Sequence, residues 1–278
     1  MSATAVFEER LHVPLPSLPE QHRIADILST VDEQIQRTDE IIEETEALKR
    51  GLMQGLLTTG PGDNVGTTEA RIGPMPVEIA DNWEVDYFDD VIELNPNDDV
   101  PNEDSFPFLP MDAVNEDTRT VDYWEERDAE DCTRPRFRKG DTVYAKTTPC
   151  TETGRIAFIE QPDGLAFGST EFLVFRAREG LMLPKYAYYL LSLPQFRAVT
   201  VSLMEGSTGR QRVPSDTFEQ NIRIPVPPME EQRTIVEALD YVQRRSEQER
   251  ETKRAYQDLK RGLMQDLLTG KARVSEDT

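Results

Sequence analysis

The sequence is poor in the residues that build metal centres and disulfide frameworks. It contains two cysteines and two histidines among 278 residues. Cys132 and Cys150 do not have the spacing of zinc ligands, and His12 and His22 have no cluster of partners around them. We therefore expect two incidental thiols, with no metal site and no disulfide framework.

Long hydrophobic runs are also missing. We find no apolar stretch of about 18 residues that could span a bilayer, and no basic start followed by an apolar segment that would direct export. The sequence predicts a soluble, cytoplasmic protein without membrane contacts. Its length allows one full domain and a further element, because single domains run to about 100–200 residues.

Positive charge is scarce. Asp and Glu total 53 against 31 Lys and Arg, which gives a formal net charge of -22, and only seven of the basic residues are lysine. This balance opposes DNA binding, because phosphates are contacted through basic side chains. It suits a protein kept soluble at high salt, where charge repulsion is screened within a few ångströms. We interpret the acidity as an adaptation to a high-salt habitat.

The charge is unevenly distributed along the chain. Residues 81–131 hold 19 acidic and two basic residues, whereas residues 132–212 hold 12 basic and seven acidic residues. The second stretch is therefore basic within a very acidic protein. A solvated face with ordinary mixing of signs is the alternative interpretation.

An internal repeat organises the chain. Residues 13–58 align without a gap on residues 224–269 at a constant offset of 211, with about two identical residues in five. The longest match is the run of seven residues 48–54 against 259–265, which is hard to obtain by chance. The same element is built twice. Its other anchors are Pro14/Pro225, Pro16/Pro227, Glu20-Gln21/Glu231-Gln232, Ile24/Ile235, Leu28/Leu239 and Val31/Val242.

Each copy predicts a long amphipathic helix after a proline-bounded start. A residue before proline is disfavoured in a helix, and Ser17 with Glu20 has capping-box spacing. Apolar residues then recur near heptad spacing, although some seam positions are polar, so each helix needs a partner. About 40 residues would give a rod of about 60 Å that ends near Gly60 or Gly270. We expect antiparallel pairing; an ordinary helical hairpin inside one core is the alternative.

The region between the copies predicts one α+β domain. A turn-rich linker comes first, then short strands at 142–146, 155–159 and 171–176. Helices are expected at 184–193 and from Pro194 onward. The fold class is thus α+β, with one mixed α/β domain flanked by two long helices that pair as an antiparallel coiled coil.

Two segments of the middle region have side chains suited to DNA. Arginine and glutamine can pair with guanine and adenine edges or with phosphate oxygens, and hydroxyls and lysines add phosphate contacts. A structural turn is an equally good interpretation of any single residue. The candidate DNA-binding residues are Arg134, Arg136, Arg138, Lys139, Lys146, Thr147 and Thr148 in the first segment, and Ser207, Thr208, Arg210, Gln211 and Arg212 in the second.

These motifs together resemble the specificity subunits of type I restriction–modification enzymes over essentially the whole chain. The repeat, with its proline lead-in, Glu-Gln pair and closing Leu-Met-Gln-x-Leu-Leu-Thr, is similar to the family's conserved region. Residues 82–85, Asn-Trp-Glu-Val, look like the opening of a target recognition domain. Residues 139–141, 168–170 and 206–209 fall where such domains carry comparable motifs.

The resemblance implies a non-catalytic subunit that binds double-stranded DNA. Its conserved regions would dock modification subunits and, indirectly, the restriction subunit. This chain would bind no cofactor itself; S-adenosylmethionine, ATP and magnesium would be held by the partners. The residues implied for partner docking are Glu20, Gln21, Lys49, Arg50, Met53, Glu231, Gln232, Lys260, Arg261 and Met264.

The chain departs from the family because it has one recognition domain where members normally have two. The resemblance divides it into a remnant of the first recognition domain (1–12), conserved region copy 1 (13–60), a linker (61–80), a target recognition domain (81–223), conserved region copy 2 (224–272) and a tail (273–278). It could be a truncated product, a cassette completed by recombination, or a half-subunit that pairs with a second specificity chain.

Two other functions remain open. An autonomous DNA methyltransferase or nuclease would need a glycine-rich cofactor loop and an Asn/Asp-Pro-Pro-aromatic motif, and Asn95-Pro96-Asn97 imitates the latter poorly. A coiled-coil scaffold, or an inactive truncated cassette without DNA recognition, predicts that the basic residues are scattered. Convergence of Arg134, Arg136, Arg138, Lys146, Arg210 and Arg212 on one concavity would favour DNA reading.

Overall fold

A computed structural model describes residues 15–62, 66–72, 75–207, 209–220 and 222–274. The chain divides into two compact units. One joins residues up to Arg50 with residues from Tyr241 onward, and the other is Gly51–Asp240. Within the described ranges, no helix combines the length and hydrophobicity that a membrane crossing requires. The predicted first-domain remnant, residues 1–12, lies outside the described residues.

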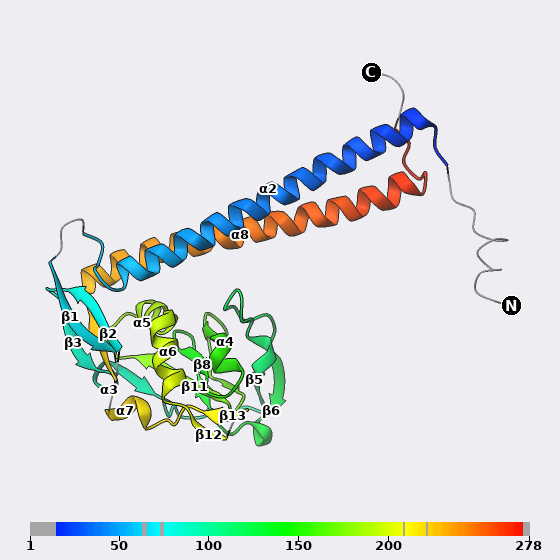
Figure 1. Cartoon of the computed structure of the whole chain (residues 1–278). Helices are drawn as coiled ribbons and strands as arrows, with labels where there is room; N and C mark the ends of the chain where they lie inside the picture. The colour runs from blue at the N-terminus through cyan, green and yellow to red at the C-terminus, as the bar shows by residue number, and fades with distance from the viewer. Residues whose placement is uncertain (1–14, 63–65, 73–74, 208, 221, 275–278) are drawn as a thin grey trace. The chain divides into compact units, whose positions relative to one another are not determined.

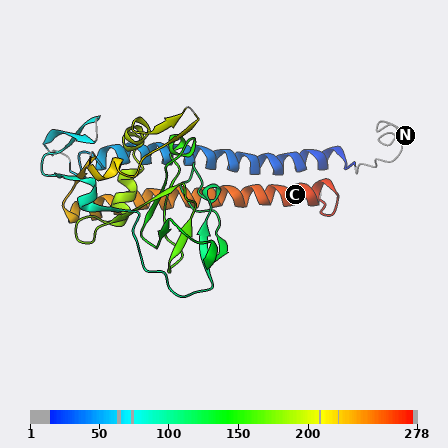
Figure 2. The same cartoon turned by 90° about the horizontal axis from the view of Figure 1, so that it is seen from below.

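The two copies of the repeat form the two long helices of the chain, α2 (Leu18–Leu56) and α8 (Met229–Leu268), which pack antiparallel (Figures 1 and 2). The predicted antiparallel coiled coil is confirmed. Ser17 accepts a hydrogen bond from the Glu20 amide at 3.4 Å, at the start of α2. Gly60 and Gly270 follow the helix ends with φ of 78° and 73°, a left-handed conformation that glycine adopts without strain.

Charged side chains tie the helices together across their seam. Glu46 pairs with Arg250 at 3.1 Å, and Asp39 pairs with Lys253. Lys49 donates to Gln243, and Lys260 pairs with Asp32. The last two contacts are the same contact made twice, because 49 and 260, like 32 and 243, are related by the repeat offset. The hairpin is therefore locally symmetric at these positions.

The domain between the helices is built on two four-stranded sheets. The first, β4-β11-β8-β9, is antiparallel throughout, and the second, β6-β5-β10-β7, contains one parallel pair, β5 with β10. The strands of the first sheet are β4 (Ile92–Leu94), β8 (Thr142–Ala145), β9 (Ile156–Phe158) and β11 (Phe172–Ala177). Those of the second are β5 (Ser105–Leu109), β6 (Glu125–Asp128), β7 (Arg136–Phe137) and β10 (Ala166–Gly168). The three strands expected from the sequence are β8, β9 and β11.

Successive side chains of the central strands point to opposite faces of the first sheet, so both faces of this sheet are packed. Val143 and Val174 point into a core shared with the second sheet, whereas their neighbours Tyr144 and Leu173 join the larger core that includes the domain's helices. This larger core contains α5 (Pro184–Leu191) and α6 (Pro194–Ser202), the two helices predicted from their initial prolines. The α+β fold class is confirmed.

Smaller elements complete the domain. The predicted linker contains a hairpin, β1 (Thr67–Ile72) with β2 (Met75–Ala80). Its strands were not predicted, because the surrounding glycines are typical of turns. A second pair joins β3 (Glu84–Tyr87) to β14 (Arg223–Val226), and a third joins β12 (Glu205–Ser207) to β13 (Arg210–Arg212). The short helices are α3 (Phe88–Val91), α4 (Cys150–Thr153), α7 (Thr217–Gln220), η1 (Met111–Ala113) and η2 (Ala129–Asp131).

Candidate nucleic-acid interface

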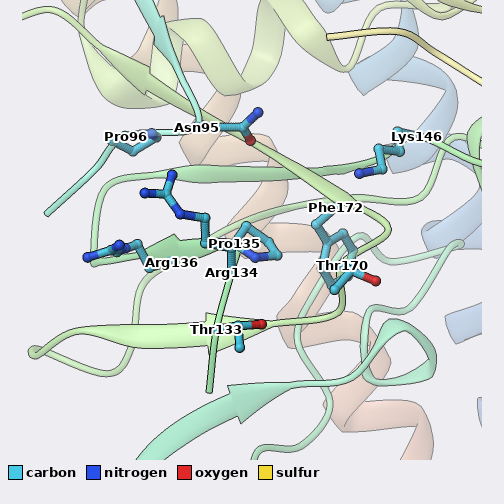
Figure 3. Close-up of a pocket in the computed structure, with 9 residues that line it drawn as sticks. All are labelled: Asn95, Pro96, Thr133, Arg134, Pro135, Arg136, Lys146, Thr170 and Phe172. Atoms are coloured by element: carbon cyan, nitrogen blue, oxygen red, sulfur yellow. The ribbon is translucent and has the colours of Figure 1, made fainter. Parts of the chain in front are cut away.

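Three of the predicted DNA-binding cations border a single pocket of about 270 Å³ (Figure 3). Arg134 and Arg136 come from the segment that leads into and forms β7, and Lys146 directly follows β8. In Figure 3 the Lys146 side chain approaches the pocket from the side opposite Arg134. The pocket is lined by Asn95, Pro96, Thr133, Arg134, Pro135, Arg136, Lys146, Thr170 and Phe172.

The second predicted segment is joined to the first through its backbone. Val213 donates to the Lys146 carbonyl at 2.8 Å, Thr148 donates to the Gln211 carbonyl at 3.1 Å, and Thr147 forms a β-bridge with Arg212. Lys146 in turn donates its own N–H to the Glu171 carbonyl at 3.0 Å. The β12–β13 hairpin is thus fixed beside residues 146–148, although about 60 residues separate them in the sequence.

A network of ion pairs fixes the basic segment to the sheet. Arg176 donates to both carboxylate oxygens of Asp98, at 2.8 and 2.6 Å, and to both oxygens of Asp141, at 2.7 Å each. The hydrogen bonds from Arg176 lower the pKa of Asp98. Burial alone would lower the pKa of Arg176, but its bonds to the two carboxylates outweigh burial and raise it. Asp141 also accepts the N–H of Arg138 at 2.9 Å, which anchors the turn after β7.

The loop that follows β4 covers the arginines. Arg134 donates to the Asn97 side-chain oxygen at 2.6 Å, and Arg136 donates to the Asp98 carbonyl. Because each guanidinium has five N–H donors, one contact leaves most donors available. The two acceptors, an amide oxygen and a backbone carbonyl, carry no net charge, although the Asp98 carboxylate also attracts Arg136 electrostatically.

The remaining candidate residues are placed less uniformly. Arg138 is exposed and lies 3.8 Å from Asp98, whereas Lys139 pairs with Asp163 at 2.8 Å and lines a different groove of about 580 Å³. Ser207, Gln211 and Arg212 belong to the β12–β13 hairpin. Thr208 lies outside the described residues, and Arg210 is described only as part of β13. The pocket therefore unites three cations, and Lys139 points elsewhere.

Several residues that line these pockets were not among the DNA-binding candidates predicted from the sequence. Asn95 and Thr170 line the pocket, and Arg127 lines an adjoining pocket of about 310 Å³ together with Thr133 and Arg134. The Arg127 guanidinium lies 3.4 Å from the centre of the Phe108 ring. Arg127 lies in the most acidic stretch of the sequence, so the local charge balance did not mark it as a candidate. For Thr170, the Gly-Ser-Thr motif at residues 168–170 was the available sequence signal.

The two Glu-Gln pairs implied for docking make contacts inside the chain. Gln21 donates to the Pro16 carbonyl and Gln232 to the Pro227 carbonyl, both at 2.9 Å, so the repeat makes the same bond twice. Gln232 is fully buried and also binds the backbone of Leu181 and Leu183. The carboxylates differ in their partners: Glu20 binds Arg273 at 2.7 and 2.8 Å, and Glu231 accepts from Asn82 and from the Trp83 indole at 2.7 and 2.8 Å.

The other docking candidates fall into two groups. Arg50 and Arg261 are exposed at repeat-related positions, as are Leu48 and Leu259, which are 56% and 50% exposed. Lys49 and Lys260 bind across the hairpin, as described above. Met53 is buried in the core of the domain, and its counterpart Met264 is 41% exposed. The repeat therefore presents an exposed leucine and arginine in both copies.

The described residues contain no cluster of three or more His, Cys, Asp or Glu side chains that could hold a metal ion. Cys132 and Cys150 are free thiols, both partly buried.

Comparisons with known proteins identify relatives of the chain. The family model described as the type I restriction modification DNA specificity domain matches residues 4–47 and 80–255. The chain is 33% identical over 165 residues to the type I restriction enzyme EcoAI specificity subunit of Escherichia coli, covering 58% of this chain and 28% of that protein. It is 27% identical over 277 residues to the MjaVIII specificity subunit of Methanocaldococcus jannaschii, covering 96% and 63%.

Solved structures share the fold. The HsdS subunit from Thermoanaerobacter tengcongensis superimposes with a TM-score of 0.52 at 18% identity, covering 94% of this chain and 60% of that one. The type I restriction–modification S subunit from M. genitalium gives 0.54 at 13% identity, covering 91% and 61%. The chain thus spans less than two thirds of the length of these relatives.

Proposed function

Because the chain belongs to the type I restriction modification DNA specificity family, we propose that it is a DNA-reading subunit of such a complex. Specificity subunits are the non-catalytic components of these complexes. The domain between the helices would recognise one half of a split duplex site, and the two conserved regions would dock modification subunits. The observation that carries this proposal is the convergence on one pocket of Arg134 and Arg136, at the start of β7, with Lys146, which follows β8.

The two predicted segments would divide the work of recognition. Arg134, Arg136, Arg138 and Lys139 would contact phosphates, because cations fix register without reading sequence. Gln211 and Arg212, with Ser207 and Arg210 of the same hairpin, would reach base edges beside Thr147 and Thr148, and we expect the same of Thr208. The bonds between residues 146–148 and 211–213 support this, since they hold both segments at a fixed separation.

Methylome sequencing tests the proposal. The chain is co-expressed with its neighbouring modification subunit, and newly methylated motifs are mapped. We expect a new motif with the wild-type chain and a relaxed motif with Gln211→Ala, because one bidentate base contact is worth about 1–3 kcal/mol. Gln161→Ala removes an exposed amide outside the pocket and serves as control. The same motif with Gln211→Ala would reject the base-reading assignment, and no motif with the wild-type chain would reject the proposed function.

The repeated exposed residues support twin docking surfaces for modification subunits. Leu48 and Leu259, with Arg50 and Arg261, would form the centre of each surface, because exposed apolar and arginine side chains are typical of interface hot spots. Glu20, Gln21, Glu231, Lys49, Lys260 and Met264 would lie around or beneath these surfaces. Met53 and Gln232 are buried and would support them from within.

Charge reversal tests the docking surfaces one at a time. We expect Arg50→Glu and Arg261→Glu each to remove one modification subunit from the co-purified complex, and the double variant to remove both, as read from native mass. Arg37→Glu makes the same charge change at an exposed position of α2 outside the repeated run. A double variant with unchanged stoichiometry would contradict the assignment.

The remaining partners follow from the family. S-adenosylmethionine would bind the modification subunits, and ATP with magnesium would bind the restriction subunit, which would associate through them. A role on cellular DNA would be carried out in the cytoplasm. We keep the division of the chain into six functional segments that the sequence suggests, from the remnant 1–12 to the tail 273–278. A second specificity chain would complete a two-part DNA site.

A further inference from the structure

The pocket between β7 and the end of β8 is unusual for so acidic a chain. Its described lining includes three cations, Arg134, Arg136 and Lys146, and no carboxylate. The chain as a whole carries 53 acidic against 31 basic residues. A recess with three positive charges and no lining acid attracts an anion, because charges of one sign gathered in a cleft raise the local concentration of counter-ions.

Two of the three cations have donors that the described residues do not satisfy. The Nε of Arg136 is buried and has no hydrogen-bond partner. The Lys146 ammonium makes no hydrogen bond or ion pair with any described side chain or carbonyl. A buried donor without a partner costs about 1–3 kcal/mol, so the Arg136 Nε points to a missing ligand or water, whereas the half-buried Lys146 contributes an unpaired charge.

The pocket is also held rigidly. Lys146 has both its backbone N–H and its carbonyl paired, with Glu171 and Val213. Arg134 and Arg136 are each tied to the Asn97–Asp98 segment. Thr133 and Thr170 add hydroxyl groups to the lining. Fixed donors lose little entropy when they bind an anion, which favours a defined contact over a diffuse one.

We propose that this pocket is the seat of one backbone phosphate of duplex DNA, an inference that rests on the DNA-reading function proposed above. Lys146 acts as a point charge and the arginines as forked donors around the same phosphodiester. The hydroxyls of Thr133 and Thr170 contribute further donors. The assignment gives Lys146 a phosphate-binding role, and it fixes the register from which the adjacent β12–β13 hairpin reads bases.

Salt dependence of DNA binding provides the test. The affinity of the assembled complex for a duplex carrying its motif is measured over a range of salt concentrations. Each neutralised phosphate contributes about 0.9 to the slope of log affinity against log salt. Lys146→Gln and Arg134→Gln should each lower this slope by about one. The double variant should lower it by no more than either single variant, because all the cations share one phosphate. Lys271→Gln, an exposed lysine elsewhere, should leave the slope unchanged.

Neutral substitutions in the DNA backbone identify the phosphate that the pocket contacts. When single methylphosphonates are scanned through the duplex, one position should remove the difference between wild type and Lys146→Gln. Inorganic phosphate, titrated at constant ionic strength, provides the second arm. Lys146-dependent binding of inorganic phosphate with an unaltered DNA slope would show that the pocket takes a free anion, and would overturn the proposal.

Additive slopes in the double variant, or unchanged slopes in both single variants, would also overturn it. These results differ from a failure of the proposed function, in which the wild-type complex itself would place no methylated motif. A complex that methylates a motif but shows unchanged slopes would refute the phosphate pocket alone.

Discussion

The two copies of the repeat begin alike and end in different surroundings. In both, the glutamine of the Glu-Gln pair binds the carbonyl of the proline five residues earlier. This bond belongs to the repeat itself. The neighbouring glutamate differs: Glu231 binds Asn82 and Trp83 of the recognition domain, whereas Glu20 binds Arg273 beyond the end of α8. Identical sequence therefore fixes the local fold, and the surroundings decide the partner.

The closing halves of the copies show a second contrast. Leu57 is completely buried in the core of the recognition domain, together with Met53. Their counterparts Leu268 and Met264 are largely exposed. The same apolar residues stabilise a domain in one copy and face solvent in the other. Substitutions at paired positions should therefore have unequal effects wherever the surroundings differ and equal effects in the symmetric seam.

The largest difference in stability between paired substitutions is expected at the leucines Leu57 and Leu268. Leu57→Ala should lower the free energy of unfolding by about 3 kcal/mol, because it leaves a cavity in a packed core. Leu268→Ala should change it by less than about 0.5 kcal/mol, as surface changes usually do. Denaturant titration measures both. Equal losses would show that the two copies are packed alike, contrary to the structure.

The glutamines should show a smaller inequality. Gln232→Ala removes three hydrogen bonds and leaves the partly buried Leu183 amide unpaired, so we expect a loss of about 2 kcal/mol. Gln21→Ala removes one bond at a partly exposed position and should cost about 0.5–1 kcal/mol. Thermal or chemical unfolding separates the two. A loss at Gln21 as large as at Gln232 would mean that the proline bond alone matters.

The seam lysines should behave equally. Lys49→Met and Lys260→Met remove the two repeat-related cross-helix contacts, to Gln243 and Asp32, and each should cost about 0.5 kcal/mol. Because these contacts are far apart on the hairpin, the double variant should show the sum. A difference of more than about 1 kcal/mol between the single variants, beyond the range of surface ion pairs, would break the symmetry of the seam.

The smallest effect is a pH dependence at Glu20. Its hydrogen bond with Arg273 lowers the pKa of Glu20, so the contact stabilises the fold above the unfolded pKa of about 4.3 and is lost as pH falls through the lower folded value. The protection of amides at the start of α2, taken relative to their intrinsic exchange rate at each pH, should therefore fall in acid. Glu20→Gln should remove that pH dependence, and an unchanged pH profile in this variant would assign it to another group.

The long helices were predictable because their signal is repeated within the chain. The offset of 211 and the flanking prolines and glycines locate both α2 and α8 to within a few residues. The seam was predicted less well. Ile24, Val31, Ile235 and Val242 are buried as heptad spacing suggests, but Leu48 and Leu259 are exposed. Thr38 and Ser246 are polar yet buried, and they lie seven residues after Val31 and Leu239, as heptad spacing indicates for seam positions.

The pocket was only half predictable. Local composition identified Arg134, Arg136 and Lys146, because basic residues stand out in an acidic chain. Asn95 and Thr170 carry no such signal and reach the pocket through sheet pairing, since β4 and β11 are neighbours. Lys139 shows the converse, because it shares the basic segment yet pairs with Asp163 and lines a different groove.

Site-specific crosslinking tests the DNA-reading role most directly. A photoreactive amino acid replaces Arg212 in the assembled complex, or Glu78 on the exposed face of the β1–β2 hairpin, and the complex binds duplex DNA that carries its methylated motif. We predict crosslinks from position 212 to bases within one half of the motif and none from position 78. Crosslinks of equal yield from both positions, or none from position 212, would contradict the assignment of this surface to DNA.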